Sequence, residues 1–198
     1  GPASGAMMAG PWLEALVSTV GPGKPAPRFN SSPVTAIADL VTMADGMGAS
    51  TADAPNSTPM APGTSVTIEN WDTGANTQLS LTTMILPSND GFVGLNNWTI
   101  PTTPGTYTVM LNAYDAGSEA NDEIVNGAGA LGSPGIPVDP GGNNGSGAMG
   151  ITDTETNETV HIHRGVIGDT SAEGGYSDLD SRVHRWLNPV ARLVVTVQ

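Results

Sequence analysis

The sequence predicts an all-β protein, an antiparallel β-sandwich with long loops and one or two short helices. Several segments of strand length alternate apolar and polar residues with a period of two, which is typical of strands that bury one face. Glycine and proline are frequent, with 26 Gly and 16 Pro among 198 residues, and this favours many turns over long helices. A chain of this length buries roughly 70% of its unfolded surface, enough for one sizeable domain.

The N-terminal part is expected to contain the short helices. Residues 1–7 resemble a cloning scar, a protease-cleavage remnant plus linker, which would imply that a natural leader peptide was removed. Residues 8–60 form an N-terminal segment that we expect to pack on the sandwich. Within it, residues 12–20 and 33–47 have helix-like apolar spacing, and each stretch is bounded by Gly or Pro, so both helices would be short.

Residues 61–198 hold the predicted β-sandwich domain. Alternation of apolar and polar residues predicts strands at 64–70, 78–86, 106–115, 159–165 and 189–198. Residues 86–97 and 116–158 are predicted loops, and the second is rich in Gly and Pro without an apolar period. A loop of that length in a compact domain is usually functional or disordered.

The chain is strongly acidic, with a formal net charge of −13. No Lys or Arg occurs between Phe29 and His163, although most of the Asp and Glu residues do. Nucleic acids and anionic lipid headgroups are bound through clustered Lys and Arg, so the charge distribution argues against both as partners. A divalent cation would relieve the repulsion best. The alternative is an acidic protein suited to a salty or exported setting.

Residue types and motifs that the sequence lacks exclude further classes of function. The chain has no cysteine, which excludes disulfides, thiolate zinc sites and cysteine nucleophiles. It has no stretch of about 18 apolar residues, so we expect no direct membrane insertion as a helix. A Gly-x-Ser-x-Gly elbow and a phosphate-cradling glycine loop are both missing, and the paired carboxylates have no cleft signature. We therefore expect that the protein is not an enzyme, and a hydrolase is the weakest hypothesis.

The acidic residues at two predicted strand ends suggest a metal site. Asp115 ends one strand and Glu119 follows after an Ala-Gly turn, while Asp90 lies just past the end of another strand. If the two loops meet at one end of the sandwich, the three carboxylates converge, and calcium takes six to eight oxygen ligands of this kind. The alternative is that they are solvated turn acids. Asp122 and Glu123 are assigned a solvated or supporting role.

A His-x-His pattern on the predicted strand at 159–165 offers a second metal site. Alternation puts His161 and His163 on one face, opposite Val160 and Ile162, close enough to share a transition metal such as copper. The alternative, which we favour, is structural: the rings hydrogen-bond the loop that follows.

Three further acids, Asp169, Asp178 and Asp180, have the same two interpretations. They either bind a second cation or cap turns and pair with Arg182 or Arg185. We favour the structural interpretation here as well.

Three stretches together resemble the spondin domain, the module found in F-spondin, mindin and many bacterial exported proteins. They are LSLTTMILPSNDGFVGLNN, LNAYDAGSEANDE and SDLDSRVHRWLNPVARLVVTV, within about residues 62–198. The family pattern is a strand ending in a Pro-Ser-x-Asp turn with an aromatic residue and Val-Gly following. An Asp-Ala-Gly turn with a following acid comes later, and a closing strand follows Pro-x-Ala-Arg. The segments VHIHRGVIGD and SDLD are similar to the bacterial branch.

The resemblance implies an eight-stranded antiparallel sandwich that holds calcium with loop carboxylates, which match Asp90, Asp115 and Glu119. The expected function is a calcium-binding, non-enzymatic module of a bacterial exported protein, used for adhesion or recognition. Its expected location is secreted, periplasmic or on the cell surface, and its expected partners are a divalent cation and a surface protein or glycan. The alternative is a periplasmic copper-handling protein that uses His161 and His163.

Overall fold

The regular secondary structure in the described part of the chain is almost entirely β-strand, and long irregular loops connect the strands. The computed structural model describes residues 16–20, 44–53, 60–117, 119–125, 136, 145–151 and 159–198. The strands are β1 (Leu16–Val20), β2 (Ser50–Asp53), β3 (Gln78–Met84), β4 (Gly91–Thr99), β5 (Gly105–Asp115), β6 (His161–Ile162) and β7 (Ala191–Val197). Every pair of neighbouring strands is antiparallel, so the all-β, antiparallel prediction is confirmed. In these described ranges, no helix has the length and apolar character that crossing a bilayer requires.

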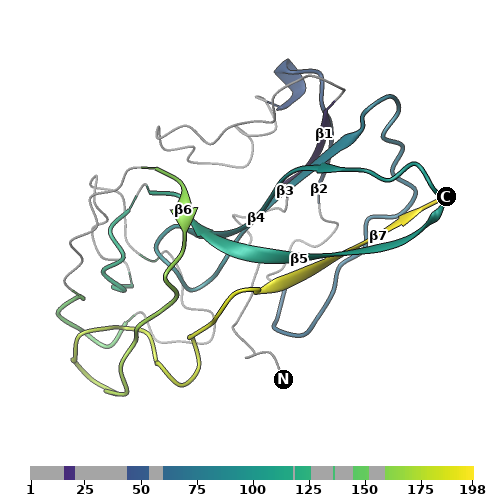
Figure 1. Ribbon diagram of the computed structural model, residues 1–198. Coiled ribbons are helices and arrows are strands. Elements are labelled where there is room, and N and C mark those ends of the chain that lie inside the picture. Colours follow the sequence, from purple (N-terminus) through teal and green to yellow (C-terminus); the bar gives the residue numbers. More distant parts are fainter. Residues whose placement is uncertain are drawn as a thin grey trace.

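Strand β5 organises the sheet, because it pairs with three other strands (Figure 1). The sheet has seven strands in the order β2-β1-β3-β4-β5-β6, and β7 pairs with β5 off this path. Residues 105–111 of β5 pair with β7, whereas its last residues, 112–115, pair with β4 and, at the very end, with β6. The arrangement of eight strands as a sandwich remains a prediction.

Of the five predicted strands, three are confirmed, the one at 159–165 is a strand only at His161–Ile162, and one is wrong. The alternating stretches at 78–86, 106–115 and 189–198 form β3, β5 and β7. The stretch at 64–70 forms no strand. It follows a turn closed by a hydrogen bond from Thr64 N to Ala61 O, and its apolar side chains are only half-buried, so no partner strand stabilises it.

The predicted loop at 86–97 is also wrong, because β4 begins at Gly91. Its glycines and asparagines resemble turn residues, but Phe92 and Val93 are buried against the core. Gly94 has a packing role: a Cβ there would lie 3.0 Å from the ring of Tyr114, which stacks on Phe92 across the strand pair. Only the short connection before Gly91 is a loop.

The N-terminal segment contributes strands to the same sheet. The helix predicted at 12–20 is wrong where the structure describes it, since β1 pairs with both β2 and β3. Cross-strand pairing overrides the helix-like apolar spacing of this short stretch. Of the helix predicted at 33–47, one turn occurs at 44–46, and residues 33–43 lie outside the described residues, as do residues 1–7.

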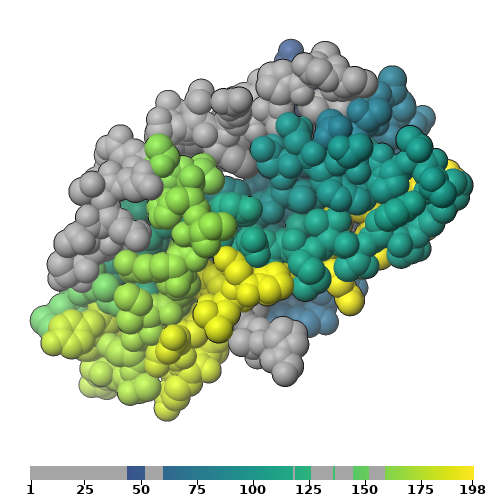
Figure 2. Space-filling view, viewed as in Figure 1, coloured from purple at the N-terminus to yellow at the C-terminus, as the bar shows by residue number. Residues whose placement is uncertain are grey.

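The core lies between the sheet and the C-terminal loops. Ile85, Val93 and Ala113 from the sheet pack with Leu179 and Trp186 from the region before β7. Residues 159–190, green to yellow in Figure 2, gather at one end of the molecule, away from the paired far ends of β5 and β7. This loop-rich end contains the acidic residues that the sequence singles out.

Candidate metal centre

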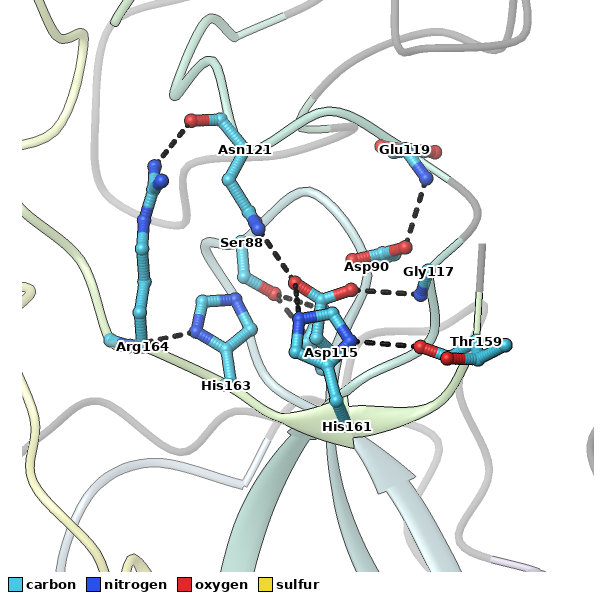
Figure 3. A network of polar contacts seen from close by, with 12 residues as sticks. Ser88, Asp90, Asp115, Gly117, Glu119, Asn121, Thr159, His161, His163 and Arg164 are labelled. Atoms are coloured by element: carbon cyan, nitrogen blue, oxygen red, sulfur yellow. Dashed lines mark hydrogen bonds and ion pairs between the residues drawn. The ribbon is translucent and has the colours of Figure 1, made fainter. Parts of the chain in front are cut away.

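The candidate centre forms where three segments meet at one end of the sheet: the connection before β4, the segment after β5, and β6. The β4–β5 register puts Gly91 opposite Asp115, so Asp90 lies beside the start of the next loop, and Ala116 N donates to Asp90 O at 3.2 Å. The β5–β6 register puts His161 opposite Asp115. Strand pairing therefore brings together residues that are 25 to 70 positions apart, within one network of polar contacts (Figure 3).

Asp90 and Glu119 are in direct contact. Glu119 N donates to Asp90 Oδ2 at 2.9 Å, and the Asp90 side chain is buried. Glu119 Oε2 is buried and has no hydrogen-bond partner within the described residues. Burial raises the pKa of Glu119 to about 8, with the charges of Asp90, Asp122 and Asp115 raising it further and a hydrogen bond from Asn89 opposing them. The site therefore concentrates negative charge.

Asp115 is the most buried of the three carboxylates, with 2% of its surface exposed. Its Oδ1 accepts a hydrogen bond from Gly117 N at 2.8 Å, and its Oδ2 accepts one from Asn121 Nδ2 at 2.6 Å. His161 Nε2 lies 3.8 Å from the same Oδ2. The charge of Asp115 thus faces neutral donors and one histidine, and it fixes the conformation of the loop that carries Glu119.

The two histidines lie on the same side of β6, as alternation predicts (Figure 3). They bond to different groups, however. His161 Nδ1 lies 2.8 Å from Thr159 O, whereas His163 Nδ1 accepts a hydrogen bond from Gly165 N at 2.8 Å. The His163 ring is buried and packs on Trp186 with centroids 5.1 Å apart. His163 therefore orients the backbone directly after β6, and the predicted bond to the loop at 168–180 stays a prediction.

Three residues of the centre, Asn89, Asn121 and Arg164, do not stand out in the sequence. Asn89 Nδ2 donates to Asp122 Oδ1 at 3.0 Å and ties the two loops together, and Asn121 orients Asp115. Arg164 reaches the same region and donates to Asn121 O at 2.7 Å. The only sequence signal is an Asn beside each acid, in Ser-Asn-Asp and Ala-Asn-Asp, which is a common turn pattern.

Glu123 is not solvated, which corrects the solvated role considered for it. Only 4% of its surface is exposed. Its Oε1 accepts a hydrogen bond from Ile167 N at 2.7 Å, and its Oε2 accepts bonds from Gly168 N at 2.8 Å and Ser177 Oγ at 2.7 Å. These donors come from one distant loop, so Glu123 fastens that loop to the sheet.

Of three other acids, Asp169 and Asp180 cap turns, and Asp178 ties distant segments together. Asp169 accepts hydrogen bonds from the amides of Ser171, Tyr176 and Ser177. Asp178 accepts bonds from Val125 N, Ala148 N and both the amide and hydroxyl of Ser146. Asp180 pairs with Arg182 at 2.6 Å. The structural interpretation of these acids is confirmed.

In the ranges that the structure covers, no three His, Asp or Glu side chains are grouped as ready metal ligands. Binding at the acidic cluster would therefore need a small rearrangement or backbone oxygens. No protein-family model, curated protein or solved structure matches the chain. The resemblance to the spondin domain therefore stays a prediction.

Proposed function

We propose that the chain is a calcium-binding, non-enzymatic module of a bacterial exported protein, with a spondin-like eight-stranded sandwich, used for adhesion or recognition. One observation carries the proposal. Asp90, Asp115 and Glu119, from two loops far apart in the sequence, lie in one buried network in which Glu119 Oε2 has no hydrogen-bond donor among the described residues. A buried carboxylate oxygen of this kind is costly unless a cation or donor approaches it.

The donor chemistry fits calcium. Calcium is a hard ion that takes carboxylate, amide and backbone carbonyl oxygens at about 2.3–2.6 Å in flexible geometry. Carboxylates and asparagine side chains supply the oxygens here. These oxygens surround the buried Glu119 Oε2, so a hard cation is the counter-charge we propose.

The mechanism follows from electrostatics. Without an ion, burial and the charges of Asp90 and Asp122 raise the pKa of Glu119 to about 8, so ionisation of Glu119 creates repulsion that favours a looser arrangement of the 85–90 and 115–123 loops. A bound ion replaces the repulsion with shared ligation and fixes both loops in one conformation. The surface that these loops present then has a single conformation. A surface protein or glycan is the recognised partner we propose, and the proposed location is secreted, periplasmic or on the cell surface.

Calcium titration by calorimetry tests this function, with Asp90→Asn as the variant. Asp72→Asn is the matched control, because Asp72 is exposed and only closes a local turn through Gly74 N. We expect the wild type and the control to bind calcium alike and Asp90→Asn to bind at least about tenfold more weakly, since it removes one charged ligand. Equal binding by the three proteins, or none by the wild type, would refute the proposal.

A further inference from the structure

Strand β7 is the longest strand at an edge of the described sheet. It lies along the first part of β5, and among the described residues β5 is the strand with which it pairs (Figure 1). The other two edge strands, β2 and β6, have only four and two residues, whereas β7 has seven. A sheet edge presents backbone N–H and C=O groups that can pair with a further strand. We propose that β7 pairs with β7 of a second copy of the chain, antiparallel and about a two-fold axis.

The sequence of β7 lacks the features that usually protect an edge strand. Natural edges are kept from pairing by short length, several charges, a proline or a bulge. Strand β7 pairs with β5 in an unbroken register, contains no proline, and carries a single charged residue, Arg192. Three of its seven residues are valines, which favour strand pairing. The sequence of β7 therefore favours the addition of a strand at this edge.

The charge distribution makes this edge the place where two copies of the chain can approach each other. Each copy has a formal net charge of −13, so two copies repel over most of their surfaces. The ribbon formed by residues 105–111 of β5 and by β7 contains no Asp or Glu, although the whole chain has 19. A contact along β7 therefore brings no carboxylates of the two ribbons together.

The side chains of β7 are also complementary to themselves in an antiparallel pair. If all seven residues overlap, the two-fold axis passes through Val194, and residues opposite each other lie on the same face of the sheet. On the outer face, the exposed Val194 lies opposite its counterpart, and Arg192 lies opposite Thr196. On the inner face, the half-buried Leu193 lies opposite Val195. No pair joins like charges, and apolar side chains on both faces become more deeply covered.

Sedimentation velocity in chelator, from micromolar to millimolar protein, is the first test, on Val194→Lys with Val183→Lys as the matched control. Both valines are exposed, at 50% and 56%, and both substitutions change the net charge equally, but Val183 lies outside the strands. We expect the wild type and the control to dimerise alike. Val194→Lys should dimerise about tenfold more weakly, because it replaces an apolar cross-strand pair with two like charges.

Salt dependence separates this dimer from an association through opposite charges. Added salt should strengthen the wild-type dimer, because it screens the repulsion between two copies that each carry a net charge of −13. Three results would overturn the proposal: a wild type that stays monomeric at every concentration, equal dimerisation by the two lysine variants, or a dimer that salt weakens.

Disulfide trapping tests the register, and the chain suits it because it has no cysteine of its own. Residues opposite each other in an antiparallel pair have Cα atoms about 4.5–5.5 Å apart, which is within the range that a disulfide spans. Mild oxidation should therefore link Val194→Cys into a covalent dimer faster than Val183→Cys. Equal rates for the two variants would overturn the proposed pairing. Neither experiment requires calcium, so the β7 contact and the calcium site can each fail without the other.

Discussion

Two groups of carboxylates lie close together at the loop-rich end of the molecule, and they differ in what neutralises them. The amide-capped acids, Glu123 and Asp178, each accept hydrogen bonds from several backbone amides or hydroxyls. The acidic loop cluster, Asp90, Asp115 and Glu119, has fewer donors and places negative charges beside one another. The comparison teaches that donor supply, and not sequence spacing, separates a structural acid from a candidate ligand.

Backbone conformation provides the donors of the first group. Gly168 has φ of 61°, and a Cβ there would lie 2.7 Å from Ser181 N, so only glycine allows its amide to point at Glu123 as it does. In the loop after β5, Glu119 N donates to Asp90, and Glu119 Oε2 accepts no hydrogen bond from the described residues. A bound cation is the counter-charge we propose for this group.

The pKa shifts of Glu119 and Asp178 have opposite signs. Burial, reinforced by neighbouring charges, raises the pKa of Glu119 to about 8. Burial also acts to raise the pKa of Asp178, but hydrogen bonds from Val125, Ala148 and Ser146 outweigh it and lower the pKa overall. Stability should therefore respond to pH in opposite directions at the two places.

The largest expected effect is at Glu123. Glu123→Gln keeps the shape but replaces one acceptor oxygen with an amide NH2 group that only donates, so it leaves a buried donor unsatisfied and removes a charge-assisted acceptor. We expect a loss of about 3 kcal/mol in the free energy of unfolding, measured by urea denaturation. Exposed Glu173→Gln is the matched control and should unfold like the wild type. A loss below about 1 kcal/mol would mean that the amide cap does not hold the loop.

Asp178→Asn is expected to lower the free energy of unfolding by about 1–2 kcal/mol near neutral pH. The carboxylate oxygens of Asp178, which accept the hydrogen bonds, are charged but partly exposed. The lowered pKa means that this stabilisation is present above the unfolded pKa of about 3.9 and is lost as pH falls through the folded value. The difference between wild type and variant should therefore shrink in acid. Thermal unfolding between neutral pH and about pH 2 measures it, and a pH-independent difference would contradict the hydrogen-bond account.

Glu119→Gln should have a smaller effect of the opposite sign. The folded state holds the Glu119 proton more tightly than the unfolded state, so wild-type stability falls as pH rises from 4.5 toward about 8. The variant removes this penalty, and after discounting for solvent screening we expect it to gain about 1 kcal/mol at about pH 9 in a chelator. Thermal unfolding checks the sign: a variant less stable than wild type there would indicate that Glu119 is an ordinary structural acid.

Arg182→Gln is expected to have almost no effect. Arg182 and Asp180 pair at 2.6 Å, but Arg182 is exposed, and solvent-exposed ion pairs contribute little to stability. The unfolding midpoint should match that of the wild type. A clear fall in the unfolding midpoint would show that Asp180 belongs with the stabilising, amide-capped acids.

The sequence predicts where the long strands and the candidate site lie better than it predicts the contacts within that site. β3, β5 and β7 follow from period-two alternation, and Asp90 and Asp115 follow from the strand ends. β1 and β4 are missed because helix-like spacing and turn-forming residues are local signals that strand pairing overrides. The opposite environments of Glu119 and Glu123, only four residues apart, depend on which distant loop supplies amides, and no spacing rule encodes that.

The pH dependence of unfolding, measured with chelator and again with saturating calcium, tests the central claim most directly. The account predicts that, in chelator, wild-type stability falls between about pH 5 and pH 9, because the acidic loop cluster ionises without a counter-charge. Calcium should raise stability most at the alkaline end and flatten the curve, and Glu119→Gln should show neither the fall nor the rescue. Parallel curves with and without calcium would contradict the claim that this cluster is a cation site.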